Sequence, residues 1–370
     1  MTGTGSSQSA KSSATAVLSR LNFLIEQARS SLGMAVAVWR ARLSLVRQLS
    51  RPTYFPPYKR PCYNMGDLTL NPTLAGIWSP VYSASVVSSY IHEQFTSGAA
   101  TYADRYAGRD HFHYLLTKAF EIADVDPGQV TAVLDVGSGA GNSIFPLLTL
   151  CPTARVFATD LSLDLLRILR DALVPDRATN VILLQLNAER LEFEPESFDL
   201  VVGASVLHHL RRPAETVKGA YRILKPGGRA IFFEPFAGGH QSLRKAYEKI
   251  LADPRGLDLS NDARDFLDRM ILDISTRGEL TPTSPLLDVL DDKWLFEPEF
   301  FEDTAARCGF ANCLAYPLYD TSTQLESITR SYFFEATGKP VDEFVPDWAW
   351  TTIRRYEGPK PANGGVILQR

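Results

Sequence analysis

Three glycines at alternate positions, Gly137, Gly139 and Gly141, follow the apolar run at residues 133–136. Glycines at such a junction let the backbone turn sharply and let a ligand approach it without interference from Cβ atoms. The fingerprint of dinucleotide-binding folds also requires glycine at the sixth position of this loop, and here that position is Asn142. The loop therefore predicts a ligand-binding turn, while Asn142 argues against a nicotinamide dinucleotide.

Polar side chains also follow the next two predicted strands. Asp160 ends the strand predicted over residues 155–159, where a carboxylate can accept hydrogen bonds from two vicinal ribose hydroxyls. The alternative role for Asp160 is to cap the next helix, although Ser162 already supplies a capping hydroxyl. Asn187 follows the strand predicted over residues 181–186, and its amide oxygen can accept a hydrogen bond.

Two pairs of histidines are further candidates for chemistry. His208 and His209 follow the strand predicted over residues 200–203. One of them can act as a general base, and the alternative is that they only order their loop. His111 and His113 are two residues apart, so they cannot share one face of a helix. We therefore predict no metal site.

Five segments, in this order, resemble the signatures of the class I S-adenosylmethionine-dependent methyltransferases. The likeness is greatest to the small-molecule branch that includes ubiquinone and menaquinone biosynthesis. The family usually has Asp where this chain has Asn187. The matching segments span residues 133–234 and are the glycine loop preceded by Asp135, the strand ending at Asp160, Asn187-Ala188-Glu189, residues 198–210, and Leu-Lys-Pro-Gly-Gly at 224–228.

The resemblance implies that S-adenosylmethionine binds at the carboxyl ends of the first three strands of the fold. It also implies transfer of the methyl group, by in-line displacement, to a small hydrophobic or aromatic acceptor, with S-adenosylhomocysteine as the product. His208 and His209 are the candidate catalytic residues. The cofactor-binding residues that it implies are Asp135, Gly137, Ser138, Gly139, Gly141, Asp160, Leu161, Asn187, Ala188 and Ser205.

Two other functions fit the same signatures. The first is a catalytically inactive protein that binds S-adenosylmethionine and acts as a partner of another protein; tight cofactor binding without turnover of any acceptor would reveal it. The second is an enzyme that uses the sulfonium group for another reaction, such as cyclisation or aminopropyl transfer.

Short apolar runs alternate with amphipathic helices from Thr131 onward, which is typical of an α/β fold with a parallel sheet. The resemblance implies a Rossmann-like sheet of seven strands in the order 3-2-1-4-5-7-6, in which only the last strand is antiparallel. It would carry a helical N-terminal cap and a helical lid insertion. The seven predicted strands are residues 132–136, 155–159, 181–186, 200–203, 229–234, 312–317 and 365–369.

Composition and periodicity divide the chain into four parts. Residues 1–14 are rich in Ser and Thr and predict a disordered tail. Residues 15–61 predict an amphipathic basic helix and a linker rich in Pro and Tyr. Residues 62–130 predict a helical cap, mostly helical after Ser83. The resemblance implies that residues 131–370 are the methyltransferase domain, with insertions at 236–295 and 321–362.

The insertions and the cap bear on the substrate. We expect helices over residues 240–251 and 261–275 to cover the acceptor pocket, and large apolar lids favour a hydrophobic or aromatic acceptor. Tyr102 and Tyr106 are four residues apart. They either close over the cofactor or simply pack between helices.

The helix predicted over residues 15–50 has basic residues opposite an apolar stripe, and three interpretations are open. It packs on the rest of the chain or on a second copy in a homodimer. It lies on a membrane surface, where basic residues suit anionic headgroups. It is an organellar transit peptide. We expect a cytoplasmic protein otherwise.

The charge distribution argues against a nucleic-acid partner. The first 60 residues hold nine Lys and Arg and one acidic residue, which leaves 29 basic and 41 acidic residues in the rest of the chain. An acidic body lacks the basic patch that a phosphate backbone requires. The four cysteines show no spacing typical of zinc sites or disulfides. No apolar stretch is suitable for crossing a bilayer.

Overall fold

A mixed β-sheet of nine strands organises the part of the chain that the structure, a computed structural model, describes. The described residues all belong to one compact unit, Tyr58–Arg370. The predicted tail at 1–14 and the predicted helix and linker at 15–61 lie outside them and stay predictions. The described residues are 70–74, 76–80, 92–173, 179–339 and 345–370.

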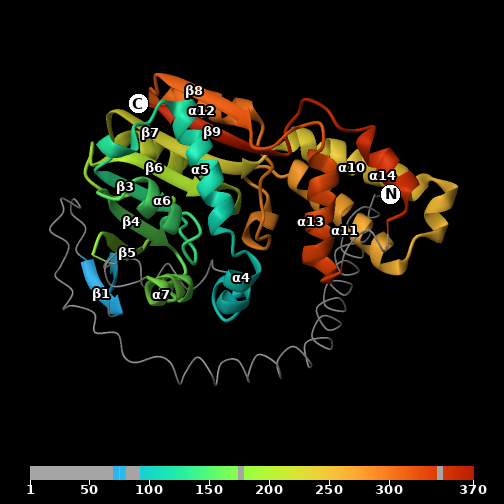
Figure 1. The fold of residues 1–370 in the computed structure, drawn as a ribbon, viewed down its shortest axis with the longest axis horizontal. Coiled ribbons are helices and arrows are strands. Elements are labelled where there is room, and N and C mark those ends of the chain that lie inside the picture. Colours follow the sequence, from blue (N-terminus) through green and yellow to red (C-terminus); the bar gives the residue numbers. More distant parts are fainter. Residues whose placement is uncertain (1–69, 75, 81–91, 174–178, 340–344) are drawn as a thin grey trace, which may run out of the picture. The chain divides into compact units, whose positions relative to one another are not determined.

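Seven of the nine strands are those predicted, in the predicted order (Figure 1). The sheet runs β1-β2-β5-β4-β3-β6-β7-β9-β8, so that β3 lies at its centre. Strands β3 to β7 pair in parallel, and β9 is antiparallel to both of its neighbours. The strands are β3 (Ala132–Val136), β4 (Arg155–Asp160), β5 (Val181–Gln185), β6 (Phe198–Ala204), β7 (Leu224–Pro235), β8 (Asn312–Pro317) and β9 (Asn363–Gln369).

The prediction of seven strands, and of a helical cap over residues 62–130, is wrong at residues 70–80. There the chain forms β1 (Leu70–Leu74) and β2 (Ile77–Pro80), joined by a turn at Gly76. Strand β2 pairs in parallel with β5, and Ile77 is fully buried. Prolines at positions 72 and 80 resemble a loop in the sequence. Pro72 lies in the edge strand β1, where one side of the strand needs no hydrogen bonds, and Pro80 ends β2 beyond its two residue pairs with β5.

The predicted boundary of the fifth strand is also wrong. Residues 224–228 were expected to form a turn before a strand at 229–234, but β7 already begins at Leu224. Leu224 pairs with Phe198, and the register shifts before Arg229 pairs with Leu200. Gly227 has φ of 79°, which explains why this segment contains the glycines of a turn although it lies within the strand.

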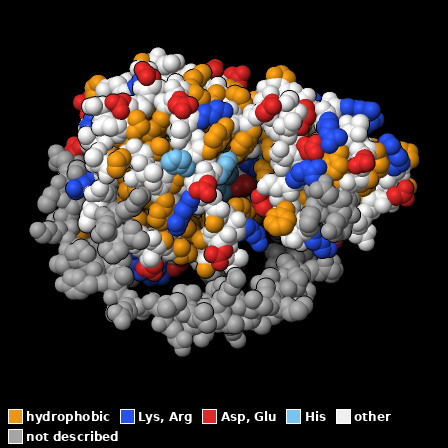
Figure 2. All heavy atoms as spheres, in the orientation of Figure 1, with side chains coloured by type: hydrophobic (Ala, Val, Ile, Leu, Met, Phe, Trp, Pro, Cys, Tyr) orange, Lys and Arg blue, Asp and Glu red, His pale blue; other side chains and the backbone are white. Residues whose placement is uncertain are grey.

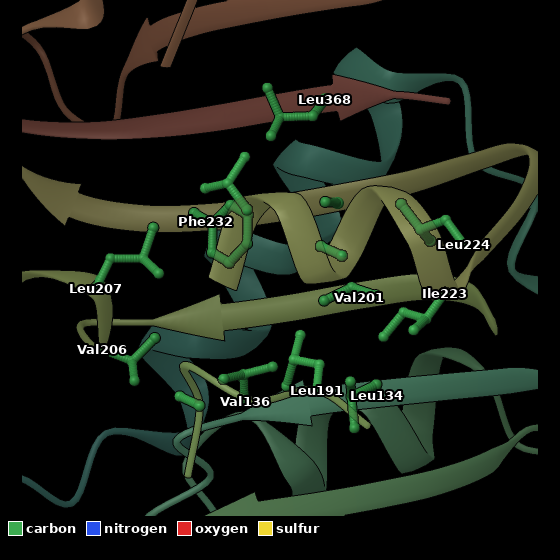
Figure 3. Packing of buried hydrophobic residues seen from close by; sticks show 14 of the residues in the cluster. Leu134, Val136, Leu191, Val201, Val206, Leu207, Ile223, Leu224, Phe232 and Leu368 are labelled. Carbon is green, nitrogen blue, oxygen red and sulfur yellow. The ribbon is translucent and has the colours of Figure 1, made fainter. Parts of the chain in front are cut away.

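Alternate residues of the central strands face two hydrophobic cores. Leu134 and Val136 of β3 pack with α9 (Pro213–Ile223) and α12 (Pro298–Cys308), as Figure 3 shows for Leu134, Val136 and their neighbours. Val133 packs on the other face, against α5 (Arg109–Ala123), α6 (Ile144–Leu150) and α7 (Leu163–Ala172). Every residue of β3 is therefore buried, as expected of a parallel strand that is covered on both faces.

The two insertions pack on each other. The first holds α10 (Ala237–Ala252) and α11 (Asn261–Gly278), which match the helices predicted there, and the second holds α13 (Gln324–Thr337) and α14 (Asp347–Arg354). All four helices contribute to a third hydrophobic cluster and lie in one group in Figure 1. In the described ranges no helix has the length and apolar character needed to span a bilayer.

Two neighbouring phenylalanines of α13 test whether this third cluster is a true core. Phe333 is fully buried against Phe266, whereas 58% of Phe334 is exposed. We predict that Phe333→Ala lowers the free energy of unfolding by about 3–5 kcal/mol, because it removes a large buried ring and leaves a cavity. Phe334→Ala should change it by less than about 0.5 kcal/mol. Urea denaturation measures both, and equal effects would contradict the packing described here.

Candidate functional site

The glycine loop after β3 has one open side. All three glycines have positive φ, which is the region that glycine alone adopts readily. A Cβ atom on Gly137 would lie 2.5 Å from Val206, and one on Gly141 would lie 2.5 Å from Leu169, so close packing requires both glycines. A Cβ on Gly139 would meet nothing within 4 Å. Gly139 is therefore the position where the loop is accessible to a ligand.

Asp135 lies beneath this loop and is fully buried. Ser143 Oγ donates to its Oδ2 over 2.8 Å, and Oδ1 has no hydrogen-bond partner among the described residues. Its backbone carbonyl accepts from Ser138 Oγ and Thr159 Oγ1, which joins the loop to β4. Burial raises the pKa of Asp135 to about 6, although the serine hydroxyls act in the opposite direction. The carboxyl group thus has one oxygen available to a further donor.

Asp160 connects the end of β4 to the glycine loop. Its Oδ2 accepts from the backbone N–H of Gly139 over 2.8 Å, and its Oδ1 accepts from that of Ser162 over 2.7 Å. Burial raises the pKa of Asp160, and these backbone hydrogen bonds oppose the rise. The cap of α7 is Ser162, whose Oγ accepts from Leu165 N over 3.1 Å. The alternative role of Asp160 as the cap of this helix is thereby excluded.

The remaining predicted cofactor residues lie at the same edge of the sheet. Asn187 Oδ1 accepts from Glu189 N over 2.9 Å, which shapes the turn after β5. Ala188 is buried, and the carbonyl of Leu161 accepts from Gln185 Nε2 over 3.0 Å. Ser205 is exposed at the end of β6 with φ of 53°. The parallel strands bring these residues together because their carboxyl ends share one edge.

Asn142 has a role that the sequence did not reveal. Its Nδ2 donates to the carbonyl of Tyr106 over 2.7 Å, and its Oδ1 accepts from Gly108 N over 3.2 Å. Both contacts attach the segment after α4 (Ala99–Arg105) to the glycine loop. The residue that takes the place of the sixth-position glycine therefore anchors a cap.

The aromatic residues of this cap lie next to Asp160. Tyr102 packs against Tyr106 at 4.7 Å and against Phe95 at 4.9 Å, measured between ring centroids. The Phe95 carbonyl accepts a hydrogen bond from Ser162 Oγ. Burial, followed by the negative charges of nearby groups including Asp160, raises the pKa of Tyr102.

Glu234, at the end of β7, organises a second polar cluster. Its fully buried carboxylate accepts from the backbone N–H groups of residues 206–208, over 2.8–3.3 Å. It also binds His208 Nδ1 at 2.7 Å. The 3-10 turn η4 (Leu207–His209) is thus held in place by one side chain. Glu234 was not predicted as a site residue, although a lone acid in the apolar run 231–236 is a visible signal.

Asp291 and Asp292 join this cluster from the first insertion. Asp292 Oδ1 lies 3.5 Å from His208 Nε2 and 3.3 Å from His209 Nδ1, and Asp291 Oδ1 also lies 3.3 Å from His209 Nδ1. Burial lowers the pKa of His208, but hydrogen bonds and charges from Asp292 and Glu234 outweigh it and raise the pKa to about 9. The face of the molecule drawn in Figure 2 mixes hydrophobic, acidic, basic and histidine side chains.

A buried arginine lies behind the two aspartates. Arg277 of α11 donates to the carbonyl of Trp294 over 2.7 Å and lies 3.7 Å from Asp292 Oδ2. Burial and the charge of Arg277 lower the pKa of His240 to about 4.

The other predicted histidine pair takes no part in this cluster, since His111 pairs with Tyr319 at 2.9 Å. The sequence predicted no metal site, but among the described residues His208, His209 and Asp292 form one group with the spacing of metal ligands.

Comparisons with known proteins show the family of the chain. Residues 134–232 match the family model described as a methyltransferase domain. The ubiquinone/menaquinone biosynthesis C-methyltransferase UbiE of Pseudomonas paraeruginosa is 31% identical over 186 residues, which are 48% of this chain and 71% of that enzyme. The chain belongs to the class I S-adenosylmethionine-dependent methyltransferases. Its cofactor is S-adenosylmethionine.

Other matches are more partial. UbiE of Ectopseudomonas mendocina is 33% identical over 130 residues, so the match covers 35% of this chain and spans only half the length of that relative. Among solved structures, a phosphoethanolamine N-methyltransferase of Haemonchus contortus in complex with phosphomonomethylethanolamine and S-adenosylhomocysteine aligns with a TM-score of 0.45 and 16% identity. That alignment covers 74% of this chain and 57% of the other.

The buried Asp135 gives a pH-dependent prediction. Because its pKa in the folded protein is raised to about 6, the stability that the neutral carboxyl group contributes is fully present below about pH 4 and is lost as the pH rises through 6. The difference from its ordinary pKa of about 3.9 corresponds to roughly 3 kcal/mol in the free energy of unfolding. Between pH 4 and 7.5, cofactor-free Asp135→Asn should therefore become more stable relative to wild type by up to that amount.

Denaturant unfolding at the two pH values measures this change. Asp171→Asn is the matched control, because 64% of the Asp171 side chain is exposed beside Arg170. Its difference from wild type should stay within about 0.5 kcal/mol at both pH values, because substitutions of exposed residues usually have small effects. The same constant difference for Asp135→Asn would contradict the raised pKa.

Proposed function

We propose that the chain transfers the methyl group of S-adenosylmethionine to a small acceptor at the carboxyl edge of the central strands, with S-adenosylhomocysteine as the product. One observation carries the proposal: the loop with Asp160 and the cluster around His208 belong to one network of contacts. The ring of Phe95 packs on Tyr102 at 4.9 Å and on His209 at 5.5 Å, and its carbonyl binds Ser162. A donor at the first site and an acceptor at the second would be neighbours.

Residues at and beside the glycine loop can bind the methionine portion, the ribose and the adenine of S-adenosylmethionine. Gly139, with open space where a Cβ would point, suits the approach of the methionine portion, and the free Oδ1 of Asp135 can accept from an added donor such as its ammonium group. Each Asp160 oxygen accepts one backbone N–H and has a second lone pair for a ribose hydroxyl. Asn187 and Ala188 lie one strand further along the edge, where adenine would follow.

The acceptor side combines aromatic rings with charged side chains. Phe95 and Tyr102 supply apolar surface, and the cluster of His208, His209 and Asp292 supplies polar groups beside it. This combination suits a small molecule with an aromatic or apolar body and one acidic group. The names of the relatives, which act in ubiquinone and menaquinone biosynthesis, support a hydrophobic acceptor for this chain as well.

Methyl transfer requires that the two reactants be held in line, because the sulfonium cofactor is already activated. The acceptor atom must also present an electron pair, which for a phenol, an enol or an acidic carbon means losing a proton. In this proposal His208 and His209 promote that loss. Glu234 is a positioning residue, since its contact with Nδ1 fixes the ring and directs Nε2 toward the insertion.

The cofactor site is tested with Asp160→Ala. Loss of a charged group that accepts two ribose hydrogen bonds should weaken S-adenosylmethionine binding by roughly 2–3 kcal/mol. Calorimetry measures the affinity, and circular dichroism verifies that the variant folds. Asp164→Ala is the control, because Asp164 is an exposed residue of α7 that pairs with Arg167. Unchanged affinity in a folded Asp160→Ala variant would refute the assignment.

The acceptor site is tested with His208→Ala. We expect methyl transfer to fall by about 10²–10⁴-fold, the usual contribution of a positioned proton-transfer group, while the affinity for S-adenosylmethionine stays within about twofold. The assay follows S-adenosylhomocysteine formation with a panel of phenols, catechols and quinols. His111→Ala is the control and should keep wild-type transfer, because His111 contacts Tyr319 outside the cluster. Equal transfer by the His208→Ala and wild-type proteins would exclude the proposed role.

A further inference from the structure

Three potential metal ligands converge where the first insertion meets the end of β6. His208 Nε2 lies 3.5 Å from Asp292 Oδ1, and His209 Nδ1 lies 3.3 Å from the same oxygen. The ligand atoms of all three side chains lie within 4.8 Å of one another. The two histidines come from a turn of the central fold, and the aspartate comes from the insertion.

These distances suit a shared metal ion as well as they suit ion pairs. A hydrogen bond between a ring nitrogen and a carboxylate is usually about 2.7–3.2 Å long, as is the 2.7 Å contact between His208 Nδ1 and Glu234. Both contacts with Asp292 are longer. Bonds of about 2.0–2.2 Å from a tetrahedral ion place neighbouring ligand atoms roughly 3.3–3.6 Å apart. The observed 3.3 and 3.5 Å lie in that range.

Glu234 provides the outer contact that a histidine ligand ordinarily has. A metal-binding imidazole usually donates its other ring N–H to a carboxylate, which fixes the tautomer and the orientation of the ring. Here His208 Nδ1 contacts Glu234, which leaves Nε2 to face Asp292. The insertion is fixed beside it, because Lys293 N donates to the His208 carbonyl over 2.8 Å. Contacts with Glu234 and with the backbone of the insertion therefore hold the three ligands in place.

We propose that His208, His209 and Asp292 bind one divalent transition-metal ion of the zinc type, with a fourth coordination position left open. Two imidazoles and a carboxylate are suitable ligands for Zn²⁺ and for Co²⁺. Three protein ligands and an open position are typical of catalytic rather than structural zinc sites. The side chain of Asp292 is 46% exposed, so a small molecule can reach the ion.

This inference rests on the proposed function and specifies how the histidines act. An acceptor hydroxyl at the open position would release its proton to solvent at a lower pH, because the ion stabilises the oxygen anion. The oxygen then uses its electron pair to form the bond to the methyl carbon. The bond from that carbon to sulfur breaks and leaves its electrons on the sulfur. The competing explanation is a network of ion pairs among the same side chains, which needs no metal.

The test uses the full-length protein after chelation and dialysis into metal-free buffer. Titration with Co²⁺ is followed by visible absorption, which reports a tetrahedral site, and titration with Zn²⁺ is followed by calorimetry. We expect one equivalent of each to bind. His209→Ala and Asp292→Asn should each weaken binding by at least about 100-fold, since loss of an outer contact alone costs roughly 10–100-fold. Asp288→Asn is the control and should bind the ion as wild type does. Asp288 lies in the same insertion as Asp292, but its carboxylate pairs with Arg211.

The outcomes separate this inference from the proposed function. The metal site is refuted if no stoichiometric Co²⁺ complex forms, or if both variants bind the ion as wild type does. If no ion binds but His208→Ala loses methyl transfer, the metal inference fails and the proposed function stands. If one ion binds and His208→Ala keeps methyl transfer, the metal site stands and the proposed role of the histidines fails.

Discussion

The buried carboxylate of Glu234 accepts hydrogen bonds from three successive backbone N–H groups and contacts the ring of His208. A charge without solvent is costly unless its oxygens are paired, so this side chain and the turn at residues 206–208 fix each other. Val206 in that turn lies against Gly137, where any Cβ would be only 2.5 Å away. His208 in the same turn meets Asp292 of the insertion. One carboxylate thereby links the glycine loop to the insertion.

The two halves of the proposed site, for the cofactor and for the acceptor, use different kinds of chemical groups. On the cofactor side, the groups that hold Asp160 are backbone N–H groups of the glycine loop and of the start of α7. These donors are positioned by parallel strands and depend little on side-chain conformation. On the acceptor side the groups are side chains, and they come from segments as distant in sequence as His208 and Asp292. The first half needs the sheet alone, whereas the second needs the sheet and the insertion together.

This difference explains what could be predicted from the sequence. The seven central strands and their order follow from apolar runs and from the family resemblance, and the glycines mark the turn at Gly137. Strands β1 and β2 were missed because they are short and contain prolines, and β2 is held through only two residue pairs with β5. Asp292 could not be predicted, since no local pattern places an insertion residue beside His208. Asn142 was read only as a missing glycine, and its contacts with residues 106–108 appear only in three dimensions.

The insertion helices have their own hydrophobic cluster, and polar contacts join them to the proposed acceptor site. Residues of that cluster, such as Phe333, can stabilise the helices without touching the site. The polar residues at the junction have the opposite role, because Asp292 and Arg277 contribute few apolar contacts but set the charge around His208. Substitutions in the insertion core should therefore change stability, and substitutions at its junction should change chemistry. In the proposed function, methyl transfer thus depends on the groups that an inserted segment brings to the carboxyl edge of the sheet.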